Sequence, residues 1–498
     1  MTDHSYAFWQ AKAKTITLKN LAFINGEYRA AQSAATYEVI NPATEQLLAE
    51  VSACDEADVD AAVSCARSSF DSGVWAGKTP SERKAIVLKL AQLIIDNKEE
   101  LALLETLDMG KPVMDALNVD VMGASAILTW YAEAADKIYD EIAPTGDGAL
   151  ATMTREPIGV IAAIVPWNFP LDIAIWKLAP ALMAGNSVIV KPAEQSPHSV
   201  LRLAELAIDA GVPKGVFNVV TGYGHVAGKA LGLHNDVDVA TFTGSTAVGK
   251  LFLRYSSESN MKPVWLETGG KSPNVIFADC ENLEKAADKA AFGIFFNQGE
   301  VCSANSRLLV ENSIKDEFVE KMIARAKAVV LGDPLNPETT MGPIVNRKQV
   351  DSIISLIERA KTEGCVAVAG GSGATIDGSS LYVQPTIFND VTNQMTIARE
   401  EVFGPVLSVI GFDSEEEAIA IANDTPYGLA ASVWTDSLNR AHRVARKIKA
   451  GTVSVNTVDA LSPMTPFGGY KQSGIGRDLS IHAFDKFTQV KTTWIDFS

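Results

Sequence analysis

The sequence predicts an α/β protein built from two doubly wound, Rossmann-like domains. Short apolar runs rich in β-branched residues alternate with helix-length segments along most of the chain. This alternation is typical of parallel sheets that carry helices on both faces. The chain has 498 residues, which is too long for one hydrophobic core. We therefore expect two or more structural units.

Residues 1–136 are patterned mainly as helices. A strand-like segment, residues 21–28, comes first, and apolar positions recur every three or four residues over 82–95. A ladder of buried strands follows between residues 158 and 266. We expect its strands at 159–165, 187–191, 216–220 and 239–243.

A second ladder lies between residues 272 and 472, with strands at 306–310 and 406–410. Two further segments, residues 149–156 and 487–495, alternate and carry residues that favour strands. They lie far apart in the sequence, so we expect them to pair with each other or with another subunit.

Composition excludes several classes of partner. The formal net charge of −17 argues against nucleic acid or an anionic membrane, because both need a basic face. No apolar run reaches the roughly 18 residues of a membrane span. The five cysteines are scattered without the spacing of zinc ligands or of a disulfide framework. We therefore expect a cytoplasmic protein that needs no metal.

Cys302 and Glu267 are the most informative residues. Cys302 ends the run Phe-Asn-Gln-Gly-Glu-Val-Cys at 296–302, and Glu267 lies in Leu-Glu-Thr-Gly-Gly-Lys at 266–271. A thiol is a good nucleophile only as a thiolate, so it needs a base or an acidifying environment. The glycines near both residues allow backbone to approach a ligand closely.

Two observations point to a nucleotide. Residues 242–246 follow a predicted strand and begin a helix, whose free N–H groups suit a pyrophosphate. Lys191 and Glu194 follow another strand at the sheet edge where open α/β sheets bind ligands. Residues 244–250 also resemble a P-loop, but Leu251 stands where that motif requires a magnesium-binding Ser or Thr.

These stretches resemble the active-site signatures of the NAD(P)-dependent aldehyde dehydrogenases, and the resemblance extends along nearly the whole chain. It is greatest overall to bacterial dehydrogenases for γ-glutamyl-aminobutyraldehyde and guanidinobutyraldehyde. The resemblance implies an NAD-binding domain of residues 1–136 and 158–269 and a catalytic domain of residues 270–472. It also implies a small β oligomerisation sheet from 137–157 and 481–498, and a homo-oligomer, expected as a tetramer formed by a dimer of dimers.

For catalysis, the resemblance implies that Cys302 attacks the aldehyde to give a thiohemiacetal and then a thioester. Glu267 would activate the water that hydrolyses the thioester. The side-chain amide of Asn168 would stabilise the oxyanion, and Lys177 matches a family lysine associated with proton relay.

The resemblance implies NAD as the cofactor. Glu194 would repel a ribose 2′-phosphate, so we expect NAD to be preferred and NADP to be the weaker alternative. The expected cofactor-binding residues are Ile164, Pro166, Trp167, Lys191, Glu194, Gly224, Phe242, Gly244, Ser245, Gly269, Glu401 and Phe403.

The substrate loop departs from the aminoaldehyde dehydrogenases. They carry an acidic stretch where this chain has the more apolar segment 456–466, which keeps one acid, Asp459. We therefore expect an aromatic or hydrophobic aldehyde, such as indole-3-acetaldehyde or phenylacetaldehyde, with an ω-amino or guanidino aldehyde as the alternative. The expected substrate-binding residues are Phe169, Ile173, Trp176, Phe296, Val301, Ser303, Asp459, Leu461 and Phe467.

Two rival interpretations belong to other classes. A fold retained for a non-catalytic role would be marked by loss of Cys302 or Glu267, and both are present. A relative that releases acyl-CoA or acts on phosphorylated substrates usually lacks the base at the position of Glu267. Its presence favours water as the acyl acceptor.

Overall fold

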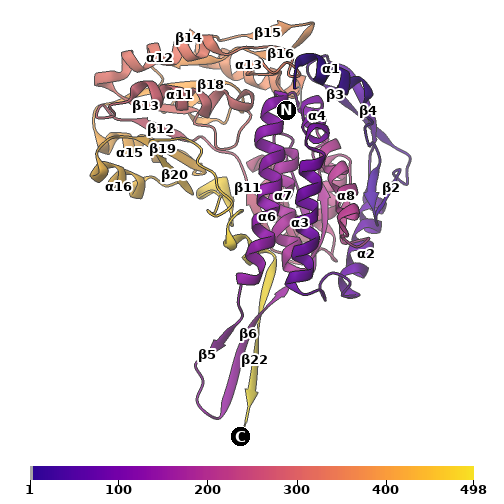
Figure 1. Cartoon of the computed structure of the whole chain (residues 1–498). Helices are drawn as coiled ribbons and strands as arrows, with labels where there is room; N and C mark the ends of the chain where they lie inside the picture. Colours follow the sequence, from indigo (N-terminus) through magenta and orange to yellow (C-terminus); the bar gives the residue numbers. More distant parts are fainter. Residues whose placement is uncertain (1–3, 498) are drawn as a thin grey trace.

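The computed structural model describes residues 4–497. Two helix-covered sheets lie beside each other, and a narrow β-ribbon extends away from them (Figure 1). This arrangement confirms the predicted α/β class with more than one sheet.

The first sheet has eight strands in the order β2-β1-β9-β8-β7-β10-β11-β21. Its five central strands are parallel. The chain runs outward from β7 to β9 on one side and from β10 to β11 on the other, so β7 and β10 flank a topological switch point, where such sheets bind ligands. The central strands are β7 (Val160–Ile164), β8 (Ser187–Lys191), β9 (Phe217–Val219), β10 (Val239–Thr243) and β11 (Val264–Glu267).

Both faces of this sheet are covered. Ile161 and Ala163 of β7 belong to one apolar core, and Val160 and Ala162 belong to another on the opposite face. Such double burial explains the continuous apolar runs in the sequence. The first core packs against α3 (Pro80–Asp96), α4 (Lys98–Met109), α6 (Met122–Ala134), α7 (Pro170–Ala184) and α8 (His198–Ala210), and the second against α2 (Glu56–Asp71), α9 (Lys229–Leu233) and α10 (Thr246–Glu258).

One expected strand divides into two. Residues 21–28 form most of a hairpin, β1 (Ala22–Ile24) and β2 (Glu27–Arg29), with β1 antiparallel to β9. Asn25 and Gly26 have φ values of 56° and 75°. Asn-Gly favours this positive-φ, two-residue turn, so the break has a clear local cause.

The second sheet has seven strands in the order β14-β17-β18-β13-β12-β19-β20. All of its pairings are parallel except that of β14 with β17. The strands are β12 (Pro273–Ile276), β13 (Arg307–Glu311), β14 (Val366–Ala369), β17 (Thr386–Asn389), β18 (Val406–Phe412), β19 (Ala430–Trp434) and β20 (Thr452–Val455). Its two faces pack mainly against α11 (Leu283–Phe295) and α12 (Lys315–Ala328), and against α13 (Arg347–Thr362), α15 (Glu415–Asn423) and α16 (Leu438–Lys447).

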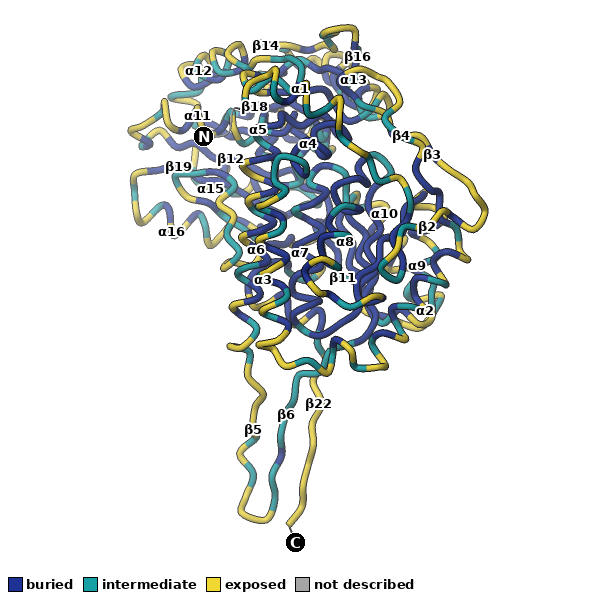
Figure 2. Tube along the Cα trace, turned by 45° about the vertical axis from the view of Figure 1, so that its right-hand side comes forward, coloured by how far each residue is buried: buried dark blue, intermediate teal, exposed yellow. Residues whose placement is uncertain are grey.

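The ribbon contains β5 (Glu141–Ala143), β6 (Ala149–Pro157) and β22 (Thr488–Asp496). β22 pairs antiparallel with β6 from Thr488↔Pro157 to Asp496↔Ala149. The two alternating segments of the sequence thus pair with each other. β22 is an edge strand and is exposed along nearly all of its length (Figure 2). Among residues 4–497, no helix has the length and apolarity that a membrane crossing requires.

Candidate active site

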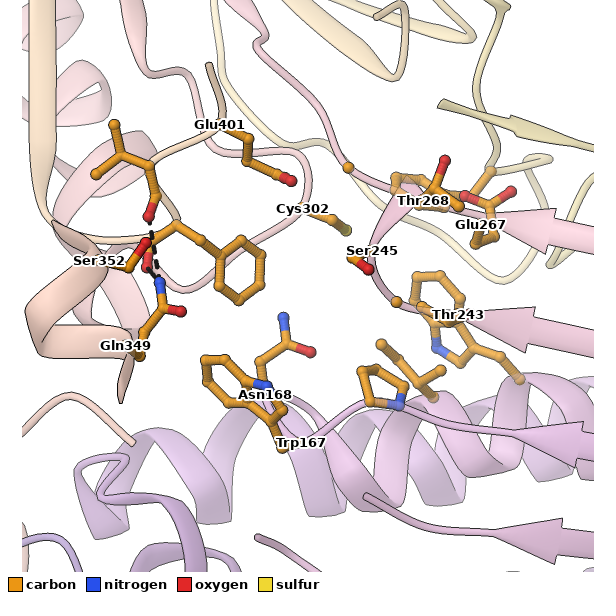
Figure 3. A pocket seen from close by; sticks show the side chains of 18 residues that line it. Trp167, Asn168, Thr243, Ser245, Glu267, Thr268, Cys302, Gln349, Ser352 and Glu401 are labelled. Carbon is orange, nitrogen blue, oxygen red and sulfur yellow. Dashed lines mark hydrogen bonds between the residues drawn. The ribbon is translucent and has the colours of Figure 1, made fainter. Parts of the chain in front are cut away.

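A cavity of about 270 Å³ lies where the end of the first sheet faces the segments around Cys302, Gln349 and Glu401. Cys302, Glu267 and Asn168 project into it from three separate segments (Figure 3). The expected site residues in its wall are Pro166, Trp167, Asn168, Ile173, Trp176, Gly244, Ser245, Glu267, Gly269, Cys302, Glu401, Phe403 and Phe467. Residues in the wall that sequence reasoning missed are Thr243, Thr268, Gln349, Ser352 and Val402.

The other expected residues lie outside this wall. Lys191, Glu194 and Gly224 lie together at the end of β8, as described below. Leu461 is 45% exposed in its loop. The remaining expected residues outside the wall are Ile164, Phe169, Lys177, Phe242, Phe296, Val301, Ser303 and Asp459.

The Cys302 thiol is held in its neutral form by its surroundings. Burial raises its pKa, and the carboxylates of Glu267, Asp459 and Glu401 raise it further. The segment before it turns sharply, with φ values of 47° at Asn297 and 58° at Gln298. Ionising this thiol therefore requires a base within reach or added positive charge.

Glu267 ends β11, and its side chain is buried. Neither carboxylate oxygen has a hydrogen-bond partner among the described residues. Burial raises the pKa of Glu267 well above its ordinary value, with a further rise from Asp478. A Cβ on Gly468 would lie 2.5 Å from Glu267 Oε1, so only glycine allows the carboxylate to occupy this place. A carboxyl group with a raised pKa is suited to exchange protons near neutral pH.

Asn168 is fixed by the segment that precedes Cys302. Its Nδ2 donates to the backbone oxygen of Glu300 at 2.8 Å, and Asn297 Nδ2 donates to the backbone oxygen of Asn168 at 3.2 Å. An amide nitrogen carries two hydrogens, so one N–H remains for a ligand in the cavity. A preorganised donor of this kind can stabilise an oxyanion.

The nucleotide side of the site lies at the ends of β8 and β10. Glu194 Oε1 accepts from the Gly224 N–H at 2.5 Å and lies 3.5 Å from Lys191 Nζ. Ser245 caps the thirteen-residue helix α10, where its Oγ accepts from the Val248 N–H at 3.3 Å. The buried Thr243 hydroxyl has no partner among the described residues. A carboxylate, an ammonium group and a helix N-terminus thus lie along one edge of the sheet.

Glu401 lies across the cavity from Asn168 (Figure 3), and Phe403 also lines the cavity. Glu401 Oε1 accepts from the Gly270 N–H at 2.9 Å, and burial raises the pKa of Glu401 to about 7. Phe403 packs edge-on against Trp167, with ring centroids 5.3 Å apart. Gln349 Nε2 donates to the Phe403 carbonyl at 2.9 Å and holds the segment in place. Gln349 lies in the first turn of α13, where polar residues are common, so nothing in the sequence marked it as a site residue.

The substrate side is aromatic. The rings of Trp176 and Phe467 meet edge-on at 5.2 Å, and both side chains are buried. Phe169 and Phe296 lie 6.2 Å apart beyond the cavity wall. Asp459 Oδ1 accepts from Ser303 Oγ at 2.8 Å, and burial raises its pKa. Its carboxylate is therefore already engaged.

Sequence reasoning missed a buried polar group beneath Phe169. Lys111 Nζ lies 3.8 Å from the centroid of the Phe169 ring and pairs with Asp120. Glu105 Oε1 accepts from the Leu171 N–H at 2.7 Å, which fixes the start of α7. These contacts hold the helix that presents Ile173 and Trp176 to the cavity.

Comparison with known proteins identifies the class. Residues 28–493 match the model of the aldehyde dehydrogenase family, and the chain belongs to this family. It is an enzyme that oxidises an aldehyde.

Three relatives show where the chain lies in the family. It is 52% identical to the NADP/NAD-dependent aldehyde dehydrogenase PuuC of Escherichia coli, over 99% of both chains. The structure matches that of an indole-3-acetaldehyde dehydrogenase of P. syringae in complex with NAD+ and IAA, with a TM-score of 0.98, 54% identity and 99% coverage of both chains. It also matches a γ-glutamyl-γ-aminobutyraldehyde dehydrogenase of Burkholderia cenocepacia, with a TM-score of 0.98 and 51% identity over 99% of this chain and 100% of that one.

Proposed function

We propose that the chain oxidises an aromatic or hydrophobic aldehyde, such as indole-3-acetaldehyde or phenylacetaldehyde, to its carboxylic acid with NAD. The observation that carries this proposal is one cavity in which Cys302, Glu267 and Asn168 lie beside the aromatic pair Trp176 and Phe467. The similarity to the indole-3-acetaldehyde dehydrogenase supports it.

In the proposed reaction, Cys302 loses its proton to a base, and the thiolate adds to the aldehyde carbon. The resulting oxyanion accepts the free N–H of the Asn168 amide. The oxyanion re-forms a carbonyl as hydride leaves the same carbon, which gives a thioester on Cys302. Glu267 then takes a proton from water, the hydroxide adds to the thioester, and the thiolate leaves as the acid forms.

The described residues fit a dinucleotide. Lys191 and Glu194 would hold the adenosine ribose, the N-terminus of α10 would bind the pyrophosphate, and Glu401 would accept from the second ribose. When bound, the nicotinamide supplies the hydride acceptor. Lys177 lies behind the cavity wall, and its proposed part in proton relay would be exerted through Glu267.

Glu194→Ser should narrow the preference for NAD over NADP. A 2′-phosphate bound beside Glu194 would be repelled by its carboxylate, whereas a ribose hydroxyl can donate a hydrogen bond to it. The kcat/KM ratio for the two cofactors measures the effect. Glu205→Ser, at a half-buried ion pair on α8, is the matched control and should leave the ratio unchanged. Equal use of both cofactors by the unmodified enzyme would contradict the charge argument.

Indole-3-acetaldehyde or phenylacetaldehyde should exceed 4-aminobutyraldehyde in kcat/KM. An aromatic ring against Trp176 and Phe467 could gain about 1 kcal/mol beyond area burial, whereas a protonated amine would meet a largely apolar wall. Trp176→Ala should weaken the aromatic substrates most, and Trp176→Phe should preserve much of their advantage. The kcat/KM values are measured for a panel of aldehydes by recording the NADH absorbance.

An ω-aminoaldehyde is the second candidate. The similarity to PuuC and to the B. cenocepacia enzyme favours it, and Asp459 supplies a partly buried carboxylate near Cys302. If 4-aminobutyraldehyde were favoured tenfold, or about 1.4 kcal/mol, this candidate would replace the aromatic one.

We also propose that the protein is a cytoplasmic homotetramer formed by a dimer of dimers. The edge strand β22 carries the exposed apolar side chains Val490, Trp494 and Ile495. An exposed edge strand of this kind suits pairing with another subunit. All five cysteines are free, which fits a reducing compartment.

A further inference from the structure

A buried group of three charges lies behind the cavity wall. We call Lys177, Asp478 and Lys486 the Asp478 cluster. Asp478 Oδ2 contacts Lys177 Nζ, and Asp478 Oδ1 contacts Lys486 Nζ. No side chain of the three is more than 4% exposed. Burial opposes ionisation of Asp478, but the two ammonium groups hold its pKa below the ordinary value. With both lysines protonated, the cluster carries one surplus positive charge.

Three separate segments form this cluster. Lys177 lies on α7, Asp478 follows the two-residue strand β21 (Gly474–Ile475), and Lys486 ends the 3₁₀ helix η7 (Ile481–Lys486). The Asp478 N–H donates to the Phe467 carbonyl at 2.7 Å, and the Phe467 N–H donates to the Asp478 carbonyl at 2.8 Å. The cluster is therefore tied to the backbone of the cavity wall.

The cluster acts on Glu267 through charge. β11 pairs with β21 at Glu267↔Gly474, which brings the segment of Asp478 beside the carboxylate. Burial and Asp478 raise the pKa of Glu267, whereas Lys177, Lys486 and Arg477 lower it. One lysine suffices to balance Asp478. The positive charge of the second lysine is not neutralised by any acid of the cluster.

We propose that Lys486 is a positioning residue for thioester hydrolysis, whose charge offsets part of the cost of burial and so favours the ionised form of Glu267 that acts as the base. This inference rests on the proposed role of Glu267. Burial lowers the pKa of Lys486 to about 8, so its ammonium is charged at pH 7 and loses its proton in the alkaline range. A base must be unprotonated to accept a proton, so hydrolysis rises with pH through the pKa of Glu267.

The test measures the acidic limb of the pH profile for thioester hydrolysis. Lys486→Met should raise the pKa of Glu267 and move that limb upward by on the order of one pH unit. NAD binding and the amplitude of the NADH burst should stay unchanged, because hydride transfer precedes hydrolysis. Lys486→Arg keeps the charge and should keep the limb in place. Lys321→Met, which removes an ion-paired lysine on α12, is the matched control.

A charge-balanced pair of variants separates electrostatics from packing. Asp478→Asn leaves two lysines without an acid and should move the limb to lower pH. Combining Asp478→Asn with Lys486→Met returns the cluster to one positive charge and should restore the original limb. If Asp478 and Lys486 had only a structural role, the losses of activity from the two substitutions would add up in the double variant.

An unmoved limb in Lys486→Met, or a double variant that is not restored, would overturn the inference. If Lys486→Met does not fold, Lys486→Gln provides the same test: a limb moved to higher pH supports the inference, and an unchanged limb opposes it. Glu267→Gln distinguishes a failure of the proposed base from a failure of the proposed role of Lys486. If that variant hydrolyses the thioester normally, the proposed base is wrong; if it stalls while the Lys486 variants show no shift, only the role of Lys486 fails.

Discussion

Cys302→Ala is expected to abolish dehydrogenase activity, with a loss on the order of 10⁴-fold or more, as for other nucleophiles. Without the thiol, no thiohemiacetal forms, and the free aldehyde is a poor hydride donor. NAD should still bind, because Lys191 and Glu194 lie outside the cavity wall that contains the thiol. Steady-state NADH formation measures the first effect, and calorimetric titration with NAD measures the second.

Cys280→Ala is the matched control for this change. Cys280 is a buried, free cysteine that does not line the cavity, so its loss should leave catalysis intact. Activity above a trace in Cys302→Ala would remove Cys302 from the role of nucleophile. Loss of NAD binding in the same variant would show instead that the substitution disturbs the whole site.

Glu267→Gln should form one NADH per active site in a burst and then nearly stop. The amide keeps the shape of the side chain but cannot accept the proton of water, so the thioester accumulates. Loss of a general base typically slows a step by about 10²–10⁴-fold. Stopped-flow absorbance resolves the burst from the slow phase.

Hydroxylamine provides the control for this variant. It attacks thioesters without a general base, so it should restore turnover of Glu267→Gln and release a hydroxamate. A variant with no burst at all would place Glu267 in the acylation step, where it would accept the proton of Cys302. A normal steady-state rate would assign water activation to another residue.

The fold was predictable where burial is continuous along the chain. The expected strands at 187–191 and 239–243 coincide with β8 and β10, because strands covered on both faces must be apolar throughout. The short strands β5 and β21 were missed. β21 has only two residues, Gly474 and Ile475, and exists because β11 offers it a partner. No local pattern encodes such pairing.

The candidate site was predictable where the chemistry requires particular neighbours in sequence, as around Cys302 and Glu267. Asp478 and Lys486 were missed because charged residues in polar segments usually lie in solvent. Their burial depends on ion pairs between segments that meet only in the folded chain. The engagement of Asp459 by Ser303 likewise became visible only in three dimensions.

The backbone bridge between Phe467 and Asp478 defines where chimeras between relatives can be joined. An exchange confined to the loop at 456–466 would replace Asp459 and Leu461, which lie outside the cavity wall, and leave the bridge untouched. A graft that continues through residue 467 would also replace the Phe467 ring in the cavity wall, whereas the backbone bridge that holds Asp478 can form again. Substrate range should therefore change more in the second kind of chimera than in the first, whereas the pH optimum should be kept in both.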